Sequence, residues 1–122
     1  MNKILIVEDN EMNRDMLTRR LERKGFDTEI AINGEEALSQ AKLYKPDIIL
    51  MDMSLPVMDG WEATQLLKKQ NETLHIPVIG LSAHAREVDV IRGKEAGCDA
   101  YETKPIDLDK LINTMQSLIS DK

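Results

Sequence analysis

The chain has 122 residues, of which 42% are hydrophobic and 31% are charged, as expected for one globular domain spanning 1–122. The net charge of −6, with basic residues scattered rather than arranged in a stripe, argues against binding to nucleic acid. Apolar runs are far shorter than the roughly 20 residues that cross a bilayer, and the N-terminus leads straight into an expected strand. We therefore expect no membrane segment, no secretory signal and, with Cys98 as the single cysteine, a cytoplasmic location.

Short apolar runs alternate with polar-rich, helix-like stretches along the chain. The runs predict strands, and the stretches between them predict helices. In the last stretch apolar residues recur at i, i+3, i+4 and i+7, from Leu108 to Ile119, which predicts a helix with one core face. We expect strands over residues 3–8, 27–31, 47–52, 78–82 and 99–102. We expect helices over about 11–24 and 86–96, and three more that begin after Asn33, Asp59 and Asp107.

Residues that favour helix ends mark several of these boundaries. Asn33 and Asp59 are good N-cap residues, and Glu36 stands where a capping box places a carboxylate that reaches back to the cap. Gly25 is a suitable C-terminal cap for the first helix. Pro77 opens the fourth strand, a position where a missing N–H does little harm.

Strands that alternate with helices over short links pair in parallel and make right-handed crossovers. The predicted fold is therefore an α/β, doubly wound, five-stranded parallel sheet with helices on both faces, a flavodoxin-like three-layer sandwich. Strand order 2-1-3-4-5 is the common solution, and it makes the first and third strands neighbours at the switch point where such folds place their chemistry.

Polar residues follow four of the predicted strands. They are Glu8 and Asp9, Asp52, Ser82 and Lys104. The carboxyl ends of parallel strands share one edge, so three carboxylates, a hydroxyl and an amine are expected to converge there. Packed carboxylates repel unless a cation balances them. Oxygen ligands without Cys or His select a hard cation, Mg²⁺ or alternatively Mn²⁺.

This set of groups also suits transfer of a phosphoryl group. Asp9 and Asp52 are the expected direct metal ligands, with Glu8 acting through water and the backbone carbonyl of Ser54 completing the protein side. A carboxylate can act as nucleophile and form an aspartyl phosphate, a role that fits Asp52. Lys104 and a hydroxyl donor would then contact the phosphoryl oxygens.

Taken together, these positions resemble a response-regulator receiver domain of two-component signalling, and the resemblance covers essentially the whole chain. Within that family the chain resembles both single-domain regulators of the DivK type and receivers of hybrid histidine kinases, and we expect no DNA-binding output domain. The matching segments are Val7–Asn10, Met51–Gly60, Leu81–Ala83 and Thr103–Ile106.

The resemblance implies a role for each site residue. It assigns the phosphoacceptor to Asp52, the acidic metal-binding pair to Glu8 and Asp9, the switch hydroxyl to Ser82, the phosphate contact to Lys104, and a cis peptide to the bond between Lys104 and Pro105. It implies a histidine kinase or histidine phosphotransfer protein as phosphoryl donor and a downstream protein as target. We expect a phosphorelay module that is a monomer and can dimerise on phosphorylation. We expect it to catalyse only its own phosphorylation and slow dephosphorylation, and no other reaction.

Two readings stay open for several other residues. Tyr101 resembles the aromatic switch of the family, or is a half-buried strand aromatic with its hydroxyl in water. Ser54 and His84 stand at rim positions that modulate acyl-phosphate hydrolysis in the family, or are loop side chains without such an effect. On phosphorylation we expect the surface of the fourth helix, fifth strand and fifth helix to change. Cys98 and Trp61 are expected to serve packing.

The methionines, among them Met12 and Met16, match the spacing of a helical core face.

Three other functions compete with the receiver function. An aspartyl-phosphate phosphatase of the haloacid-dehalogenase kind needs an acid two residues after its nucleophile, where Ser54 stands. An FMN carrier needs a phosphate-binding loop after the first strand, where this chain is acidic. A phosphorylation-independent interaction module would have lost the acids or the lysine, and both are present here.

Overall fold

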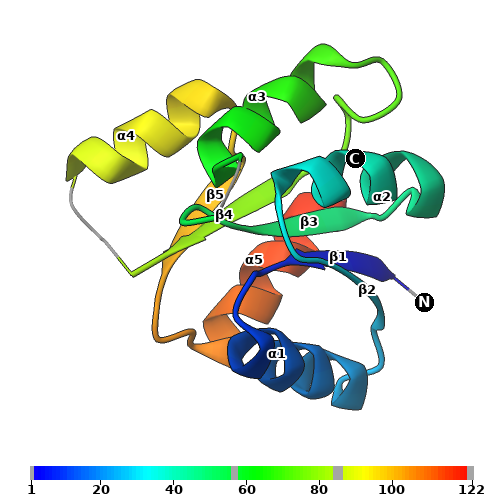
Figure 1. The fold of residues 1–122 in the computed structure, drawn as a ribbon. Helices are drawn as coiled ribbons and strands as arrows, with labels where there is room; N and C mark the ends of the chain where they lie inside the picture. The colour runs from blue at the N-terminus through cyan, green and yellow to red at the C-terminus, as the bar shows by residue number, and fades with distance from the viewer. Residues whose placement is uncertain (1, 56–57, 84–86, 121–122) are drawn as a thin grey trace.

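The structure, a computed structural model, describes residues 2–55, 58–83 and 87–120. A sheet of parallel strands forms the central layer, and helices pack against both of its faces (Figure 1). The strands are β1 (Lys3–Val7), β2 (Asp27–Ala31), β3 (Ile48–Asp52), β4 (Val78–Ser82) and β5 (Ala100–Thr103). The helices are α1 (Glu11–Arg23), α2 (Gly34–Tyr44), α3 (Gly60–Lys69), α4 (Glu87–Ala96) and α5 (Leu108–Ser120). Within the described ranges, none of these helices has the length and apolarity needed to cross a bilayer.

The sheet has the strand order β2-β1-β3-β4-β5, which confirms the predicted fold class and order. All four strand pairs are parallel. In register, Val7 lies opposite Met51 and Asp52 lies opposite Leu81. The residues that follow β1, β3 and β4 therefore emerge at one edge of the sheet. Strands β1, β3 and β4 are buried on both faces, except for Lys3 at the start of β1. Their nearly continuous apolar sequences predict this burial.

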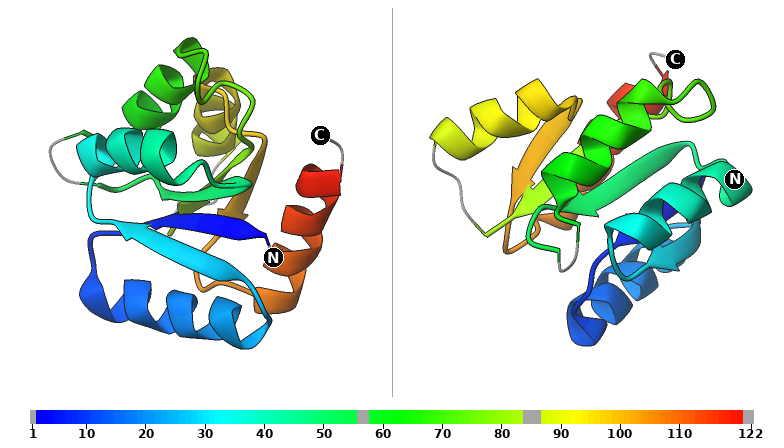
Figure 2. Two further views of the ribbon diagram at one scale, coloured as in Figure 1. Left: turned by 90° about the vertical axis from the view of Figure 1, so that its right-hand side faces the viewer. Right: turned by 45° about the horizontal axis from the view of Figure 1, so that its top comes forward.

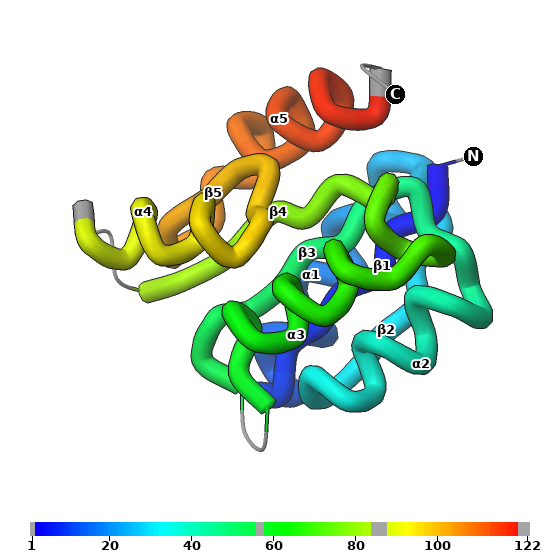
Figure 3. The backbone as a smooth tube through the Cα atoms, turned by 90° about the horizontal axis from the view of Figure 1, so that it is seen from above, coloured from blue at the N-terminus to red at the C-terminus, as the bar shows by residue number. Residues whose placement is uncertain are grey.

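Two apolar clusters hold the three layers together. Helices α1 and α5 cover one face of the sheet, while α2, α3 and α4 cover the other (Figure 2). Seen from above, α3 lies between α2 and α4 (Figure 3). The predicted core face of α5 is confirmed, since Leu111 and Met115 are fully buried against β1, β3 and β4. This packing holds the strand ends in place.

The predicted caps are found at the helix ends. The side chain of Asn33 accepts a hydrogen bond from the amide of Glu36 at 2.8 Å, and Asp59 accepts one from the amide of Glu62 at 2.9 Å. The carboxylate of Glu36 does reach back, but to the amide of Ile32 at 3.2 Å rather than to the cap residue itself. Each bond satisfies an amide that the helix or its entry leaves unpaired.

Strand β5 begins one residue later than predicted. Asp99 lies just before the strand, and its carboxylate accepts hydrogen bonds from the amide of Val78 at 2.8 Å and from the ammonium of Lys68 at 3.0 Å. Position 86, where the fourth helix was expected to begin, lies outside the described residues, and α4 is described from Glu87.

The start of α3 lies directly against the end of β3. A methyl group added at Gly60 would come within 2.5 Å of the carbonyl oxygen of Asp52 and 2.7 Å of the Cα of Met53. Both are main-chain atoms that cannot turn aside, so only glycine allows this approach. The contact holds the loop after β3 close to the sheet edge.

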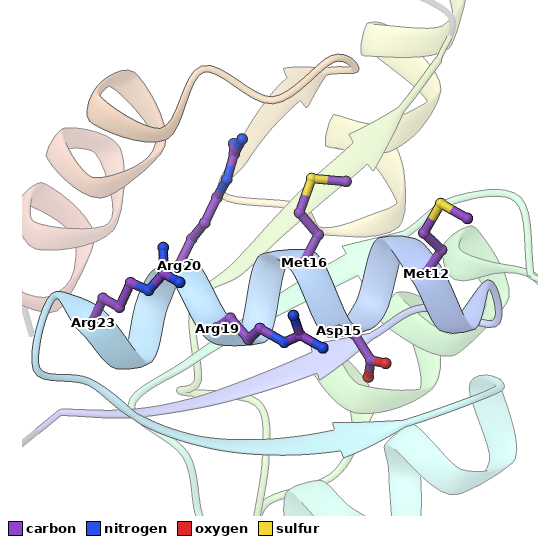
Figure 4. Close-up of a pocket in the computed structure, with 6 residues that line it drawn as sticks. All are labelled: Met12, Asp15, Met16, Arg19, Arg20 and Arg23. Carbon is purple, nitrogen blue, oxygen red and sulfur yellow. The ribbon is translucent and has the colours of Figure 1, made fainter.

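The expectation that Met12 and Met16 belong to a core face is wrong. Met12 and Met16 are 75% and 45% exposed, and they line a surface pocket together with arginines of α1 (Figure 4). Spacing of i and i+4 places two residues on one face of a helix but does not say which face is buried. The core side of α1 is formed by Leu17 and Leu21 instead.

Candidate functional site

Three carboxylates converge at the edge where β1 and β3 end. Glu8 and Asp9 follow β1, and Asp52 is the last residue of β3. One carboxylate oxygen from each lies within 4.8 Å of the others. Glu8 and Asp52 are 6% and 4% exposed, whereas Asp9 is open to solvent. The predicted convergence of these three acids is therefore present, with two carboxylates buried and one at the surface.

Lys104 brings a positive charge into this cluster from the end of β5. Its backbone amide donates to the carbonyl oxygen of Ser82 at 2.8 Å, which extends the pairing of β4 and β5 by one residue. Its Nζ donates to Oε1 of Glu8 at 2.8 Å and lies 3.5 Å from Oδ2 of Asp52. The peptide bond from Lys104 to Pro105 is cis. One ammonium thus faces two buried carboxylates.

The electrostatics of the cluster follow from that imbalance. Burial, together with the neighbouring carboxyl group of Asp52, raises the pKa of Glu8 from 4.5 to about 7, although Lys104 acts in the opposite direction. Partial burial of the Lys104 ammonium by itself lowers its pKa, but the carboxylates of Glu8 and Asp52 outweigh this effect and hold it above its usual value. Without a metal ion, a proton binds to Glu8 more readily than to a free glutamate, and Lys104 holds its charge.

Hydrogen bonds from main-chain amides hold the carboxylates of Asp52 and Glu8 in place. The amide of Ser54 donates to Oδ1 of Asp52 at 3.0 Å, and the amide of Asn10 donates to Oε2 of Glu8 at 3.3 Å. Asn10 is also the N-cap of α1, because its side chain accepts the amide of Asn13 at 2.9 Å. Asn10 is a site residue that was not predicted from the sequence, although an asparagine just before a helix is a signal for a cap.

The donor set fits a divalent cation. All three acidic groups offer hard oxygen ligands, they are held within reach of one ion, and the cluster carries more negative charge than Lys104 can balance. The exposed Asp9 leaves an approach from solvent. A cation bound here would also relieve the repulsion that raises the pKa of Glu8.

The remaining predicted site residues lie around this cluster. Ser82 ends β4 and is buried, one residue beyond the partner of Asp52 in the strand register. Ser54 is exposed at the rim of the site, two residues after Asp52. His84 falls outside the described residues. The roles assigned to Ser82, to the carbonyl of Ser54 and to His84 stay predictions.

Tyr101 packs its ring between β4 and α4. A methyl group at Gly93 in α4 would lie 2.9 Å from Cδ2 of the ring, and one at Gly80 in β4 would lie 3.1 Å from the same atom. The hydroxyl of Tyr101 is buried and has no hydrogen-bond partner within the described part of the chain. The reading in which this hydroxyl lies in water is therefore wrong, while a switching role stays a prediction.

Two further residues serve packing, as expected from the sequence. Trp61 packs against the cluster under α2 and α3, and the guanidinium of Arg92 lies 4.0 Å from its ring centroid, so it joins α3 to α4. Cys98 is 8% exposed, and burial raises the pKa of its thiol to about 11, which disfavours the reactive thiolate.

Comparison with known proteins gives one consistent family. Residues 4–116 match the family described as response regulator receiver domain. The polar-differentiation response regulators DivK of Brucella anthropi and Brucella ovis are each 42% identical over 118 residues, which is 97% of this chain and 96% of each relative.

Solved structures agree with the sequence relatives. The receiver domain of a signal transduction histidine kinase from Syntrophus aciditrophicus aligns with a TM-score of 0.91 at 37% identity, covering 99% of this chain and 92% of that one. The receiver domain of a sensor histidine kinase from Pseudomonas aeruginosa aligns with a TM-score of 0.91 at 33% identity, covering 98% of both chains. That protein holds a magnesium ion coordinated in its active-site cleft.

The raised pKa of Glu8 predicts that Mg²⁺ binding depends on pH around neutrality. A proton on Glu8 competes with the metal below its pKa of about 7, so affinity should fall about tenfold between pH 8 and pH 6. Isothermal titration calorimetry at both values measures this, and Glu8→Gln should flatten the dependence. An equally steep pH dependence in Glu8→Gln would contradict the assignment.

The same shift predicts the sign of a stability change. Because Glu8 has a higher pKa in the folded protein than its ordinary 4.5, its contribution to folding is fully present below pH 4.5 and is lost as pH rises through about 7. In EDTA, the wild type should therefore lose more stability between pH 5 and pH 8 than Glu8→Gln does.

The contact between Tyr101 and Gly93 predicts that a methyl group added at position 93 changes the stability in opposite directions with and without the tyrosine ring. In the wild type, Gly93→Ala should destabilise the protein by about 1–2 kcal/mol, because overpacking against the ring exceeds the gain in helix propensity. In a Tyr101→Ala background, the same substitution should stabilise the protein by about 0.5–1 kcal/mol. Urea denaturation of the four proteins measures the coupling. Equal effects on stability in both backgrounds would show that the ring of Tyr101 does not occupy the space beside Gly93.

Proposed function

The chain belongs to the response regulator receiver domain family of two-component signalling, and on that basis we propose that Asp52 accepts a phosphoryl group from phosphohistidine with the help of Mg²⁺. The observation that carries the proposal is the meeting of Glu8, Asp9 and Asp52 within 4.8 Å beside the ammonium of Lys104. A buried nucleophile, a place for a cation and a further positive charge are what phosphoryl transfer to a carboxylate requires.

The proposed reaction is a single displacement at phosphorus. A carboxylate oxygen of Asp52 forms a bond to phosphorus as the bond from phosphorus to the donor nitrogen breaks, and the histidine leaves with that electron pair. Bound Mg²⁺ supplies neutralisation of charge on the phosphoryl oxygens. Glu8, Asp9, Asp52 and the backbone carbonyl of Ser54 would hold it.

The other residues of the site then act on the phosphoryl group once it is attached. The Lys104 ammonium, already 3.5 Å from Asp52, would turn toward one phosphoryl oxygen. The hydroxyl of Ser82 would donate to another. Movement of Ser82 would pull the loop after β4 and alter the packing of Tyr101 against α4, so that the surface of α4, β5 and α5 carries the signal. Ser54 and His84 would modulate how fast water reaches the aspartyl phosphate.

A groove beside α1 supports a protein as the phosphoryl donor. It has a volume of about 290 Å³ and runs from Glu8 and Lys104 along α1 to Met16 and Arg20. Its lining is mostly apolar and includes Leu81. Exposed methionines beside arginines on α1 (Figure 4) are suited to a helix that carries apolar and acidic residues. We therefore assign the docking of a histidine kinase or phosphotransfer protein to this groove.

Residues 1–122 would then form one receiver domain, which catalyses only its own phosphorylation and slow dephosphorylation. The proposal includes a cytoplasmic location, supported by a single cysteine that has no partner in the chain. It also includes a monomer that can dimerise on phosphorylation, and a protein as downstream target. No contact favours the phosphatase alternative, since Ser54 occupies the position where a general acid would be needed.

Replacement of the acceptor tests the proposal directly. Asp52→Asn should abolish incorporation of phosphate from acetyl phosphate in Mg²⁺, measured by intact-protein mass spectrometry, because the amide is not a nucleophile. Asp15→Asn, which alters an exposed carboxylate on α1, should be labelled like the wild type. Equal labelling of Asp52→Asn and the wild type would overturn the assignment. Labelling of the wild type that is unchanged in EDTA would overturn the metal role.

Docking along α1 predicts a difference between protein and small-molecule donors. Met16→Asp should slow transfer from a phosphorylated histidine kinase by about tenfold or more, since a charge would replace an apolar contact. Labelling by acetyl phosphate should be unchanged, because that donor needs no docking surface. Leu43→Asp is the matched control, as this exposed side chain lies on α2 away from the groove. An equal loss with both donors, or in the control, would argue against docking at this groove.

A further inference from the structure

We propose that Arg14 is a positioning residue that holds the metal-binding loop from within α1. Its Nη1 donates to the carbonyl oxygen of Glu8 at 3.1 Å and to that of Asp9 at 3.5 Å. Both bonds go to the main chain, so Arg14 acts on the backbone from which the two carboxylates project. The inference rests on the proposed metal site and adds to it a residue that supplies no ligand.

The loop needs such a tie on the Asp9 side. The Glu8 carboxylate is already held by the amide of Asn10 and by Lys104. The Glu8 amide is held by the carbonyl oxygen of Ala31 at 3.0 Å. Asp9 is exposed, and the bond from Arg14 to its carbonyl oxygen ties its backbone to α1. The orientation of the Asp9 carboxylate therefore depends on a main chain that Arg14 holds.

Arg14 is half-buried, and the placement of its guanidinium indicates a specific role. Its Nε is buried and has no hydrogen-bond partner among the residues the structure describes. Leaving a buried donor unpaired is unfavourable, and an arginine on a surface helix normally keeps its guanidinium in water. Arg19, Arg20 and Arg23 of the same helix do so (Figure 4). Arg14 instead directs its guanidinium to the loop, where its bonds to the carbonyl oxygens offset part of that cost.

Charge and geometry make opposite predictions for this residue. A guanidinium near a cation site repels Mg²⁺, so on charge alone its removal should tighten binding. Its hydrogen bonds hold two ligand-bearing residues in place, so on geometry its removal should weaken binding. Lysine keeps the charge, but its ammonium sits on a shorter, flexible stem and lacks the rigid guanidinium plane that directs Nη1 to both carbonyl oxygens. The sign of the change in Mg²⁺ affinity therefore separates the two effects.

The test compares Mg²⁺ binding by the wild type, Arg14→Met, Arg14→Lys and the control Arg19→Met, an exposed arginine of the same helix. Isothermal titration calorimetry with MgCl₂ measures the dissociation constant of the folded proteins. We expect an increase of about tenfold for Arg14→Met and of about threefold or more for Arg14→Lys. The control should stay within about twofold of the wild type.

Each result decides between the alternatives. Tighter or unchanged binding in Arg14→Met would overturn the positioning role and leave only the effect of charge. Lower stability in urea and EDTA, with unchanged Mg²⁺ affinity, would assign Arg14 to folding alone and would also overturn the proposal. Arg14→Lys keeps the test decisive if Arg14→Met does not fold. Absence of Mg²⁺ binding in the wild type would instead overturn the proposed function itself, and this inference with it.

Discussion

The functional site depends on one constraint: three carboxylates are held together at the ends of two neighbouring strands. Strand order places β1 beside β3, so Glu8, Asp9 and Asp52 meet at one edge of the sheet. Their mutual repulsion is unfavourable for folding, and Lys104 balances only part of it. The buried strands and their apolar cover hold the acids in place against this repulsion. Charged groups held in place by the fold are what catalysis by charge stabilisation requires.

The same packing connects the acidic edge to the surface of α4. Asp52 and Ser82 end adjacent strands, and Tyr101 in β5 packs beside β4 and against α4. Glycine at position 93 makes room for the ring, and the hydroxyl of Tyr101 is buried without a hydrogen-bond partner among the residues that the structure describes. The contact between Tyr101 and α4 is the path by which the proposed movement of Ser82 would reach that helix.

Much of the fold and site could be predicted from local pattern. Apolar runs flanked by cap residues such as Asn33 and Asp59 placed the strands and helices to within a residue or two. Polar residues at strand ends identified Glu8, Asp9, Asp52 and Lys104 as neighbours before any coordinates. The error at Met12 and Met16 arose because helical spacing defines a face without saying what covers it.

The sequence by itself determined the alternation of elements, the parallel sheet and the polar residues at its carboxyl edge, because these depend on short spacings, and its matching segments carried the resemblance to the family. Only the tertiary structure decided how buried each group is and what it contacts. The raised pKa of Glu8, the contact of Arg14 with two carbonyl oxygens and the buried hydroxyl of Tyr101 depend on groups from separate elements. Desolvation and close contact arise only when the layers pack, so no local pattern in the sequence contains them.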